Sequence, residues 1–145
     1  MKRGTTEHPK FLDLCTQLSI PRYAGVRMLE FLWHFTARFV PRGDIGKFSN
    51  SAIARALEWE KGTDELIQAL VDCRWIDEGP THRLVIHDWH EHADEYLHNR
   101  LARAHQLFVS GHPPKLTRLP SRERETIERL YRESATEAHK NADTT

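Results

Sequence analysis

The sequence predicts a mainly α-helical fold with a small antiparallel sheet. Apolar residues recur at helical spacing through most of the chain. In two short runs, apolar residues alternate with polar ones instead. These runs flank turn-forming residues around Gly79 and Pro80, a pattern typical of a β-hairpin. A length of 145 residues with 39% apolar residues suffices for one domain with a core and an appended tail.

Two helices are predicted after a disordered start at residues 1–8. The first covers residues 9–18, where a proline suits the first turn and apolar residues follow at helical spacing. The second begins at Pro21 and ends near residue 40. Its wide apolar face includes Trp33, and a wide face indicates a helix that is buried from several sides.

A short strand is predicted next, within the segment "DIGKFS" at residues 44–49. The segment is too short for a helix, and its apolar residues are Ile45 and Phe48. We expect the strand to cover residues 45–48 and to join the later hairpin in a three-stranded sheet.

Two short helices with a tight break between them follow this strand. Ser49 is a good N-cap for a helix at residues 50–59. The break lies at residues 60–62, and Thr63 is expected to cap a second helix at residues 64–74.

The segment at residues 75–87 predicts a β-hairpin in which Trp75 begins the first strand. From Asp88 the apolar period becomes helical again, and it remains so to about residue 109. We expect Asp88 to cap this helix and Trp89 to fill the core between the hairpin and the helix. Trp33, Trp75 and Trp89 are therefore interpreted as structural residues.

The order of these elements is that of a winged helix-turn-helix followed by C-terminal helices. We expect a winged-helix domain, with the helix that follows it, at residues 9–109. A basic connector would cover residues 110–121, and residues 122–145 would form a C-terminal helix with a frayed end.

Four stretches of the chain resemble a known family over about residues 8–105. The resemblance is to the N-terminal winged-helix domain of phage and prophage replisome-organiser proteins and of DnaD-type bacterial replication initiators. In that family a strand ends in a tryptophan that opens the following helix, as Trp89 does here. The resemblance implies a role in DNA replication in a phage-derived setting, and it implies no catalytic residues. The stretches are "LEFLWHFTARF", "GDIGKFSNSAIARALEW", "LIQALVDCRWID" and "LVIHDWHEH".

The net charge is zero over the whole chain but is unevenly distributed. Residues 1–42 carry a net charge of +4, residues 43–98 of −7 and residues 99–145 of +3. The second helix of a helix-turn-helix reads bases with its N-terminal side chains, and here it begins with Asp64 and Glu65. These acids repel phosphates, so protein docking or oligomerisation stays open beside DNA binding.

We expect any DNA contact to involve mainly the backbone, through residues around this helix and in the basic connector. The candidates near the helix-turn-helix and hairpin are Lys47, Arg55, Lys61, Thr63, Gln68, Arg74, His82 and Arg83. The candidates in the connector and the last helix are Lys115, Arg118 and Arg122.

A cluster of histidines and acids at residues 84–98 raises the alternative of a metal site or a catalytic site. On one continuous helix, His90, Asp94 and His98 would share a face at i, i+4 spacing. The metalloprotease signature is absent, and neither a glycine-rich phosphate loop nor a nucleophile elbow occurs. We favour a structural joint, and a metal-dependent enzyme remains the less favoured reading.

These observations predict a cytoplasmic protein that is not an enzyme and has no cofactor. The N-terminus lacks the apolar run of a secretory signal, and no apolar stretch is long enough to span a membrane. Cys15 and Cys73 lie in apolar patterns typical of reduced core cysteines. The expected partners are DNA and a replication or regulatory protein, possible self-association included. A transcriptional regulator is an alternative to a replication protein.

Overall fold

The computed structural model describes residues 4–116 and 119–143, with side chains as far as residue 136. The fold is mainly α-helical with a small antiparallel sheet, as the sequence predicts, and this sheet has two strands. The chain divides into two compact units, one ending at Ala93 and the other beginning at Asp94.

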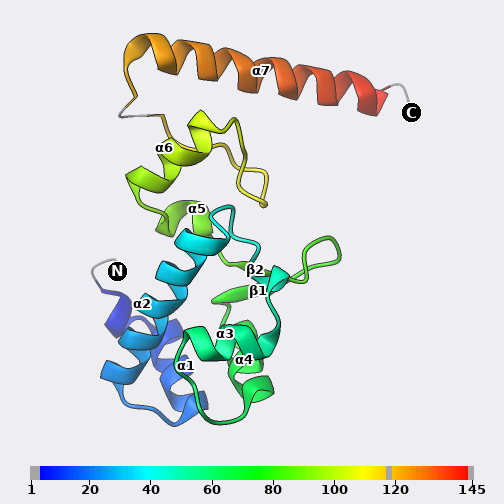
Figure 1. Ribbon diagram of the computed structural model, residues 1–145. Helices are drawn as coiled ribbons and strands as arrows, with labels where there is room; N and C mark the ends of the chain where they lie inside the picture. The colour runs from blue at the N-terminus through cyan, green and yellow to red at the C-terminus, as the bar shows by residue number, and fades with distance from the viewer. Residues whose placement is uncertain (1–3, 117–118, 144–145) are drawn as a thin grey trace. The chain divides into compact units, whose positions relative to one another are not determined.

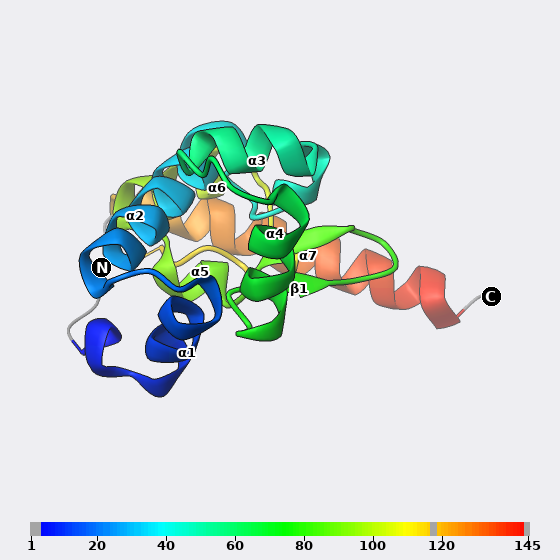
Figure 2. The same ribbon diagram turned by 90° about the horizontal axis from the view of Figure 1, so that it is seen from below.

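The helices α1 to α4 of the first unit form a closed ring in which each packs against two others (Figures 1 and 2). They are α1 (Pro9–Leu18), α2 (Arg22–Phe39), α3 (Asn50–Ala56) and α4 (Thr63–Asp72). Helix α1 packs against α2 and α4, and α3 also packs against α2 and α4. Apolar side chains from all four helices are fully buried in the ring, and their removal from water drives its formation. They include Phe11, Leu29, Ile53 and Leu66.

A β-hairpin follows α4 and projects from the helices, as both views show (Figures 1 and 2). Its strands are β1 (Ile76–Glu78) and β2 (Leu84–Ile86), which pair in antiparallel fashion with Ile76 opposite Ile86. Ile76, Leu84 and Ile86 are buried, whereas Asp77 and Glu78 are exposed. The hairpin is therefore anchored by its apolar face on the helices.

The predicted third strand is wrong, because Ile45–Lys47 form the short 3-10 helix η2. The Gly43 carbonyl accepts hydrogen bonds from both the Ile45 and the Ile86 amides, each at 3.0 Å, so the chain turns where a strand would continue. Gly46 then lies flat against β2, where an added Cβ would be only 2.4 Å from the Leu84 nitrogen. This segment packs on the hairpin without adding a strand to it.

The first helix of the helix-turn-helix begins at Asn50 as predicted, but both helices end earlier than predicted and α4 begins one residue earlier. Helix α3 ends at Ala56 and α4 at Asp72 because Glu58 and Arg74 adopt left-handed conformations, with φ of 55° and 64°. In each case the next amide donates back to a carbonyl of the last helical turn, as in a Schellman motif. Thr63 is not the cap of α4: it is the first helical residue, and Gly62 occupies the N-cap position.

The start of the chain is also more ordered than predicted. Thr5–Glu7 form the 3-10 helix η1, so the expected disorder is wrong for these residues. His8 follows η1 and caps α1, because its Nδ1 accepts a hydrogen bond from the Lys10 amide at 3.1 Å. This cap connects η1 to α1.

The single helix predicted from residue 88 to residue 109 is wrong as well. Helix α5 (Trp89–His92) is one turn long, and α6 (Glu95–Arg103) begins after a break. Asp94 causes the break, because its carboxylate accepts a hydrogen bond from the Leu97 amide at 2.9 Å and caps α6. Asp88 occupies the N-cap position of α5, but its side chain makes no capping hydrogen bond, and its carboxylate lies 3.3 Å from the His87 Nε2 atom instead.

Trp89 lies in the core of the first unit, as the sequence predicts, and is 4% exposed. Its indole nitrogen donates a hydrogen bond to the Pro41 carbonyl at 2.8 Å. Gly43 has a φ of +101°, and a Cβ at this residue would lie 3.0 Å from the indole ring. Trp75 is also buried, and it contacts the half-buried Trp33 edge-on at 6.3 Å between ring centroids.

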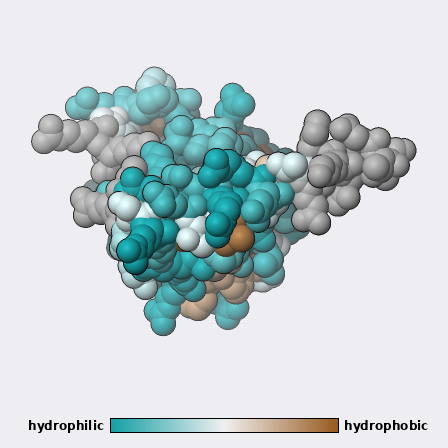
Figure 3. All heavy atoms as spheres, turned by 90° about the horizontal axis from the view of Figure 1, so that it is seen from above, coloured by the Kyte–Doolittle hydropathy of each residue, from teal (hydrophilic) through white to brown (hydrophobic). Residues whose placement is uncertain are grey.

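The second unit consists of α6 and α7 (Ser121–Asp143) with the segment that joins them. Its core cluster is small and comprises Ala102, Leu116, Leu119, Ile127 and Tyr131. The Tyr131 hydroxyl donates to the Gln106 carbonyl at 2.8 Å, and burial raises the pKa of this hydroxyl. The coloured surface in Figure 3 is mostly hydrophilic, and exposed polar residues dominate residues 121–136 of α7.

None of the helices in the described part of the chain combines the length and the apolar character needed to cross a membrane.

We predict that Trp89→Ala lowers the free energy of unfolding by about 3–5 kcal/mol, the cost of truncating a large buried aromatic side chain. Trp89→Phe retains most of the packing and loses one hydrogen bond, so it should cost less. Urea unfolding followed by circular dichroism measures both. The half-buried His90 provides the comparison: a larger loss from His90→Ala than from Trp89→Ala would contradict this assignment.

Candidate nucleic-acid interface

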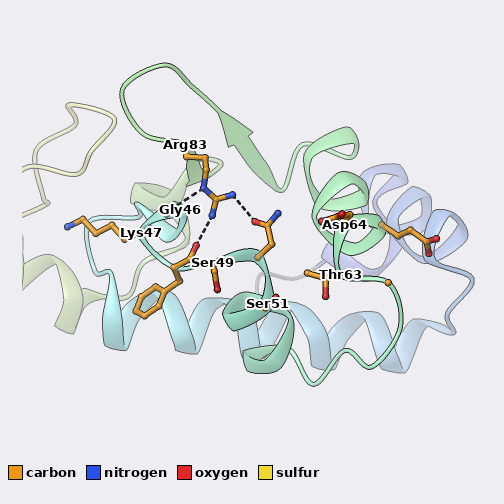
Figure 4. A pocket seen from close by; sticks show the side chains of 11 residues that line it. Gly46, Lys47, Ser49, Ser51, Thr63, Asp64 and Arg83 are labelled. Atoms are coloured by element: carbon orange, nitrogen blue, oxygen red, sulfur yellow. Dashed lines mark hydrogen bonds between the residues drawn. The ribbon is translucent and has the colours of Figure 1, made fainter.

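An open groove of about 820 Å³ lies where α3, α4 and the hairpin meet (Figure 4). The residues before and in the first turn of α3 form one wall, and the first turn of α4 forms another. Arg83, at the end of the hairpin loop immediately before β2, reaches into the groove. The groove is lined by Gly46, Lys47, Phe48, Ser49, Asn50, Ser51, Gly62, Thr63, Asp64, Glu65 and Arg83.

Arg83 connects the hairpin to the start of α3 through three hydrogen bonds, drawn as dashed lines in Figure 4. Its Nη2 donates to the Phe48 carbonyl at 2.6 Å, its Nη1 to the Asn50 side-chain oxygen at 2.7 Å, and its Nε to the Gly46 carbonyl at 3.4 Å. A planar guanidinium suits this fork of acceptors. Arg83 was predicted as a phosphate contact, and its geometry gives it a positioning role in the groove as well.

Lys47 is the second cation at the groove. Its side chain is 70% exposed, and its Nζ lies 3.0 Å from a carboxylate oxygen of the buried Asp44. Asp44 therefore offsets part of the Lys47 charge, while the exposed ammonium group keeps donors available for a further partner.

The first turn of α4 brings negative charge to the same groove. Thr63 and the exposed Asp64 and Glu65 all line it. The acids suit the positive end of the helix macrodipole, which stabilises α4. They also repel a phosphate at the position where a DNA-reading helix would meet the major groove. The chemistry of this site therefore favours contacts at its edge over contacts at the end of α4.

Arg55 and Lys61 do not line the groove and lie on a neighbouring part of the surface. Both line a second surface pocket, together with Arg27, Glu58, Trp59 and Glu60. The Lys61 ammonium lies 5.9 Å from the centroid of the Trp59 ring. Gln68 lines a third pocket and donates a hydrogen bond to Asp72 at 2.7 Å.

The remaining candidates are not brought together with this groove. Arg74 follows the C-terminal end of α4, the end opposite the groove, and His82 lies in the hairpin loop. Lys115 and Arg122 belong to the second unit, where the Lys115 amide donates to the His98 ring at 2.9 Å. Arg118 lies outside the described residues.

The residues proposed for a metal site have separate structural roles. Asp94 caps α6, and His98 is buried against Phe108 with its ring accepting a backbone hydrogen bond. His90 belongs to the one-turn helix α5. Among the side chains of residues 4–116 and 119–136, no three His, Cys, Asp or Glu lie close enough to hold a metal ion. His87 contacts Asp77 at 2.7 Å and so connects β1 to the end of β2.

Burial weakens the reactivity of the two cysteine side chains. It raises the pKa of the Cys15 and Cys73 thiols, which disfavours the reactive thiolate. Burial also lowers the pKa of the Lys10 amine, which lies 4.2 Å from the centroid of the Trp75 ring. The three side chains pack at the edge of the helical ring.

Sequence reasoning missed Ser49, Asn50 and Ser51 as residues of the groove. Ser49 was predicted as the cap of α3, and its hydroxyl does accept a hydrogen bond from the Ala52 amide at 3.1 Å. A known pairing of Asn50 with Arg83 would have identified Asn50 as a residue of the groove. That pairing joins residues 33 positions apart, which no local pattern reveals.

Comparison with protein-family models, with curated proteins and with solved structures found no match for this chain.

We predict that Arg83→Met loosens the hairpin from α3 while leaving the helical core folded. The exposed position of Arg83 limits the expected loss of stability to about 1 kcal/mol. Hydrogen exchange of the backbone amides in residues 46–50 and 83–86 should accelerate. Arg55→Met, an exposed arginine on α3, is the matched control. Equal exchange in the two variants would show that Arg83 does not hold the hairpin.

Proposed function

We propose that this chain is a cytoplasmic, non-enzymatic winged-helix protein that associates with DNA mainly through the phosphate backbone. The observation that carries the proposal is the groove at the meeting of α3, α4 and the hairpin, with Lys47 and Arg83 on one side. A helix-turn-helix with an adjacent hairpin is an arrangement that DNA-binding proteins use to place a helix and a loop against a duplex.

The acidic start of α4 defines the kind of contact we propose. Asp64 and Glu65 disfavour insertion of this helix end between phosphates, although a carboxylate can accept a hydrogen bond from a cytosine amino group. Lys47, Arg55 and Lys61 supply positive charge beside it. Binding should therefore be weak, dependent on salt and largely independent of sequence.

The proposed setting is a phage-like DNA replication module. It rests on the resemblance of residues 8–105 to the winged-helix domain of replisome-organiser and DnaD-type initiator proteins. In this setting the protein would also recruit a replication protein. A role as a transcriptional regulator is the alternative biological setting, and the DNA chemistry would be the same.

A second candidate function is protein docking or self-association without intrinsic DNA affinity. The exposed acids of α4 favour it, because Asp64, Glu65 and Asp72 suit a basic protein surface better than a phosphate backbone. Light scattering across a range of protein concentrations tests self-association. A monomer that binds DNA would favour the first proposal.

We predict that binding of a 20-base-pair duplex weakens steadily as salt increases, with a negative log–log slope from counterion release. Fluorescence anisotropy at several salt concentrations measures it. Lys47→Gln should reduce the magnitude of the slope by about one unit if Lys47 contacts a phosphate. A slope near zero, or no binding at low salt, would overturn the proposed DNA association.

We also predict that neutralising the start of α4 tightens duplex binding. The double variant Asp64→Asn, Glu65→Gln should bind roughly 5- to 30-fold more tightly at low salt, because each like charge at about 4 Å costs up to about 1 kcal/mol in water. The double variant Glu7→Gln, Asp13→Asn changes the net charge equally at exposed residues outside the groove. Equal gains from the two variants would mean that only net charge matters.

A further inference from the structure

Three phenylalanines form a cluster at the end of α2, beside the groove. The ring centroids of Phe35 and Phe39 are 5.1 Å apart, those of Phe35 and Phe48 are 4.9 Å apart, and those of Phe39 and Phe48 are 6.2 Å apart. Phe35 and Phe39 come from α2, whereas Phe48 follows η2. We call these three residues the aromatic cluster.

The aromatic cluster opens to solvent. Phe35 and Phe48 are half-buried, and Phe39 is 53% exposed. An exposed phenylalanine ring costs free energy in water, and rings that are packed edge to face still leave their outer faces accessible. Phe35 and Phe48 therefore support the Phe39 ring at the surface.

Positive charge surrounds the aromatic cluster. The Arg38 guanidinium lies 5.2 Å from the centroid of the Phe39 ring, and Lys47 immediately precedes Phe48. Residues 31–51 contain three Lys or Arg and one acid, a net charge of +2. The acid, Asp44, is buried. This edge of the molecule thus differs from the acidic first turn of α4.

The cluster is continuous with the groove described above. Phe48 and Lys47 both line the groove. The Phe48 carbonyl accepts the shortest of the three Arg83 hydrogen bonds, at 2.6 Å, which holds this residue's backbone in place. A chain that lies in the groove would therefore meet Lys47 and Phe48, the member of the aromatic cluster that lines it.

We propose that the aromatic cluster binds single-stranded nucleic acid, with an unpaired base stacked on Phe39 and the adjoining phosphates held by Arg38 and Lys47. This inference rests on the proposed function and names its substrate class. Aromatic rings interleaved with cations are the chemistry by which proteins hold single strands, because every base has a π-face and every nucleotide a phosphate. A paired duplex cannot offer its stacked base faces to Phe39.

The position of Arg38 fits this binding mode. Its guanidinium lies over the Phe39 ring, and guanidinium planes stack on bases as aromatic rings do. The base would either displace Arg38 toward a phosphate or stack on its outer face. A partner protein with an apolar anchor would gain nothing from the surrounding cations unless it were also acidic, so the charge favours nucleic acid.

The test compares four ligands and four forms of the full chain by fluorescence anisotropy at low salt. The ligands are a single-stranded dT oligonucleotide, its RNA equivalent, a strand of the same length made of abasic nucleotides, and a duplex. The protein forms are the wild type, Phe39→Leu, Phe39→Trp and Tyr23→Leu. Tyr23 is the matched control because its ring is 77% exposed on the same helix, about 24 Å away along the axis.

The proposal expects Phe39→Leu to weaken binding of the base-containing single strands by about 5- to 100-fold. Phe39→Trp should retain that binding, and Tyr23→Leu should not change it. Binding of the abasic strand should be the same in all forms, because phosphates alone are contacted. Quenching of a 2-aminopurine base in the single strand by the wild type, and not by Phe39→Leu, provides an independent measure of stacking.

The outcomes separate this inference from the proposed function. If the duplex binds and Phe39→Leu leaves single-strand binding unchanged, the stacking inference is overturned and the proposed DNA association stands. Equal losses for abasic and base-containing strands would overturn it too, since stacking needs bases. If none of the four ligands binds the wild type at low salt, both proposals fail. Tighter binding of the DNA or of the RNA strand identifies which one fits the site.

Discussion

The first unit depends on the packing of Trp89 against the turn that ends α2. The indole donates to the Pro41 carbonyl, and its ring covers Gly43, which has a left-handed backbone that favours glycine. The Gly43 carbonyl in turn accepts a hydrogen bond from Ile86 in β2. One turn therefore joins the end of α2, the hairpin and α5, so that side-chain burial and backbone hydrogen bonding reinforce each other there.

The turn that follows α2 also determines the geometry of the groove. Because the turn places η2 against β2, Gly46 lies next to Leu84 and the carbonyls of Gly46 and Phe48 come within reach of Arg83. The Schellman-type end of α3 then begins the connection to α4, and that of α4 leads into the hairpin. The hairpin and the start of α3 are thus held together by the Arg83 hydrogen bonds.

The surface around the groove has two regions that differ in charge. The start of α4 carries acids that stabilise the helix and repel phosphates. The edge that contains Arg38, Lys47 and the aromatic cluster carries cations and exposed rings. Both proposals above draw on this asymmetry: backbone-directed contact for a duplex, and base stacking for a single strand.

The sequence by itself determined the fold class, the hairpin, the helices α1 to α4 and the buried position of Trp89, because each has a local periodic or capping signal. Only the tertiary structure decided the rest. Ile45–Lys47 became a 3-10 helix since long-range contacts with Ile86 and Leu84 left no room for a strand. Glu58 and Arg74 end their helices without the glycine that marks such ends in sequence. The Arg83 bonds and the aromatic cluster join residues distant in the chain, so only folding brings their chemistry together.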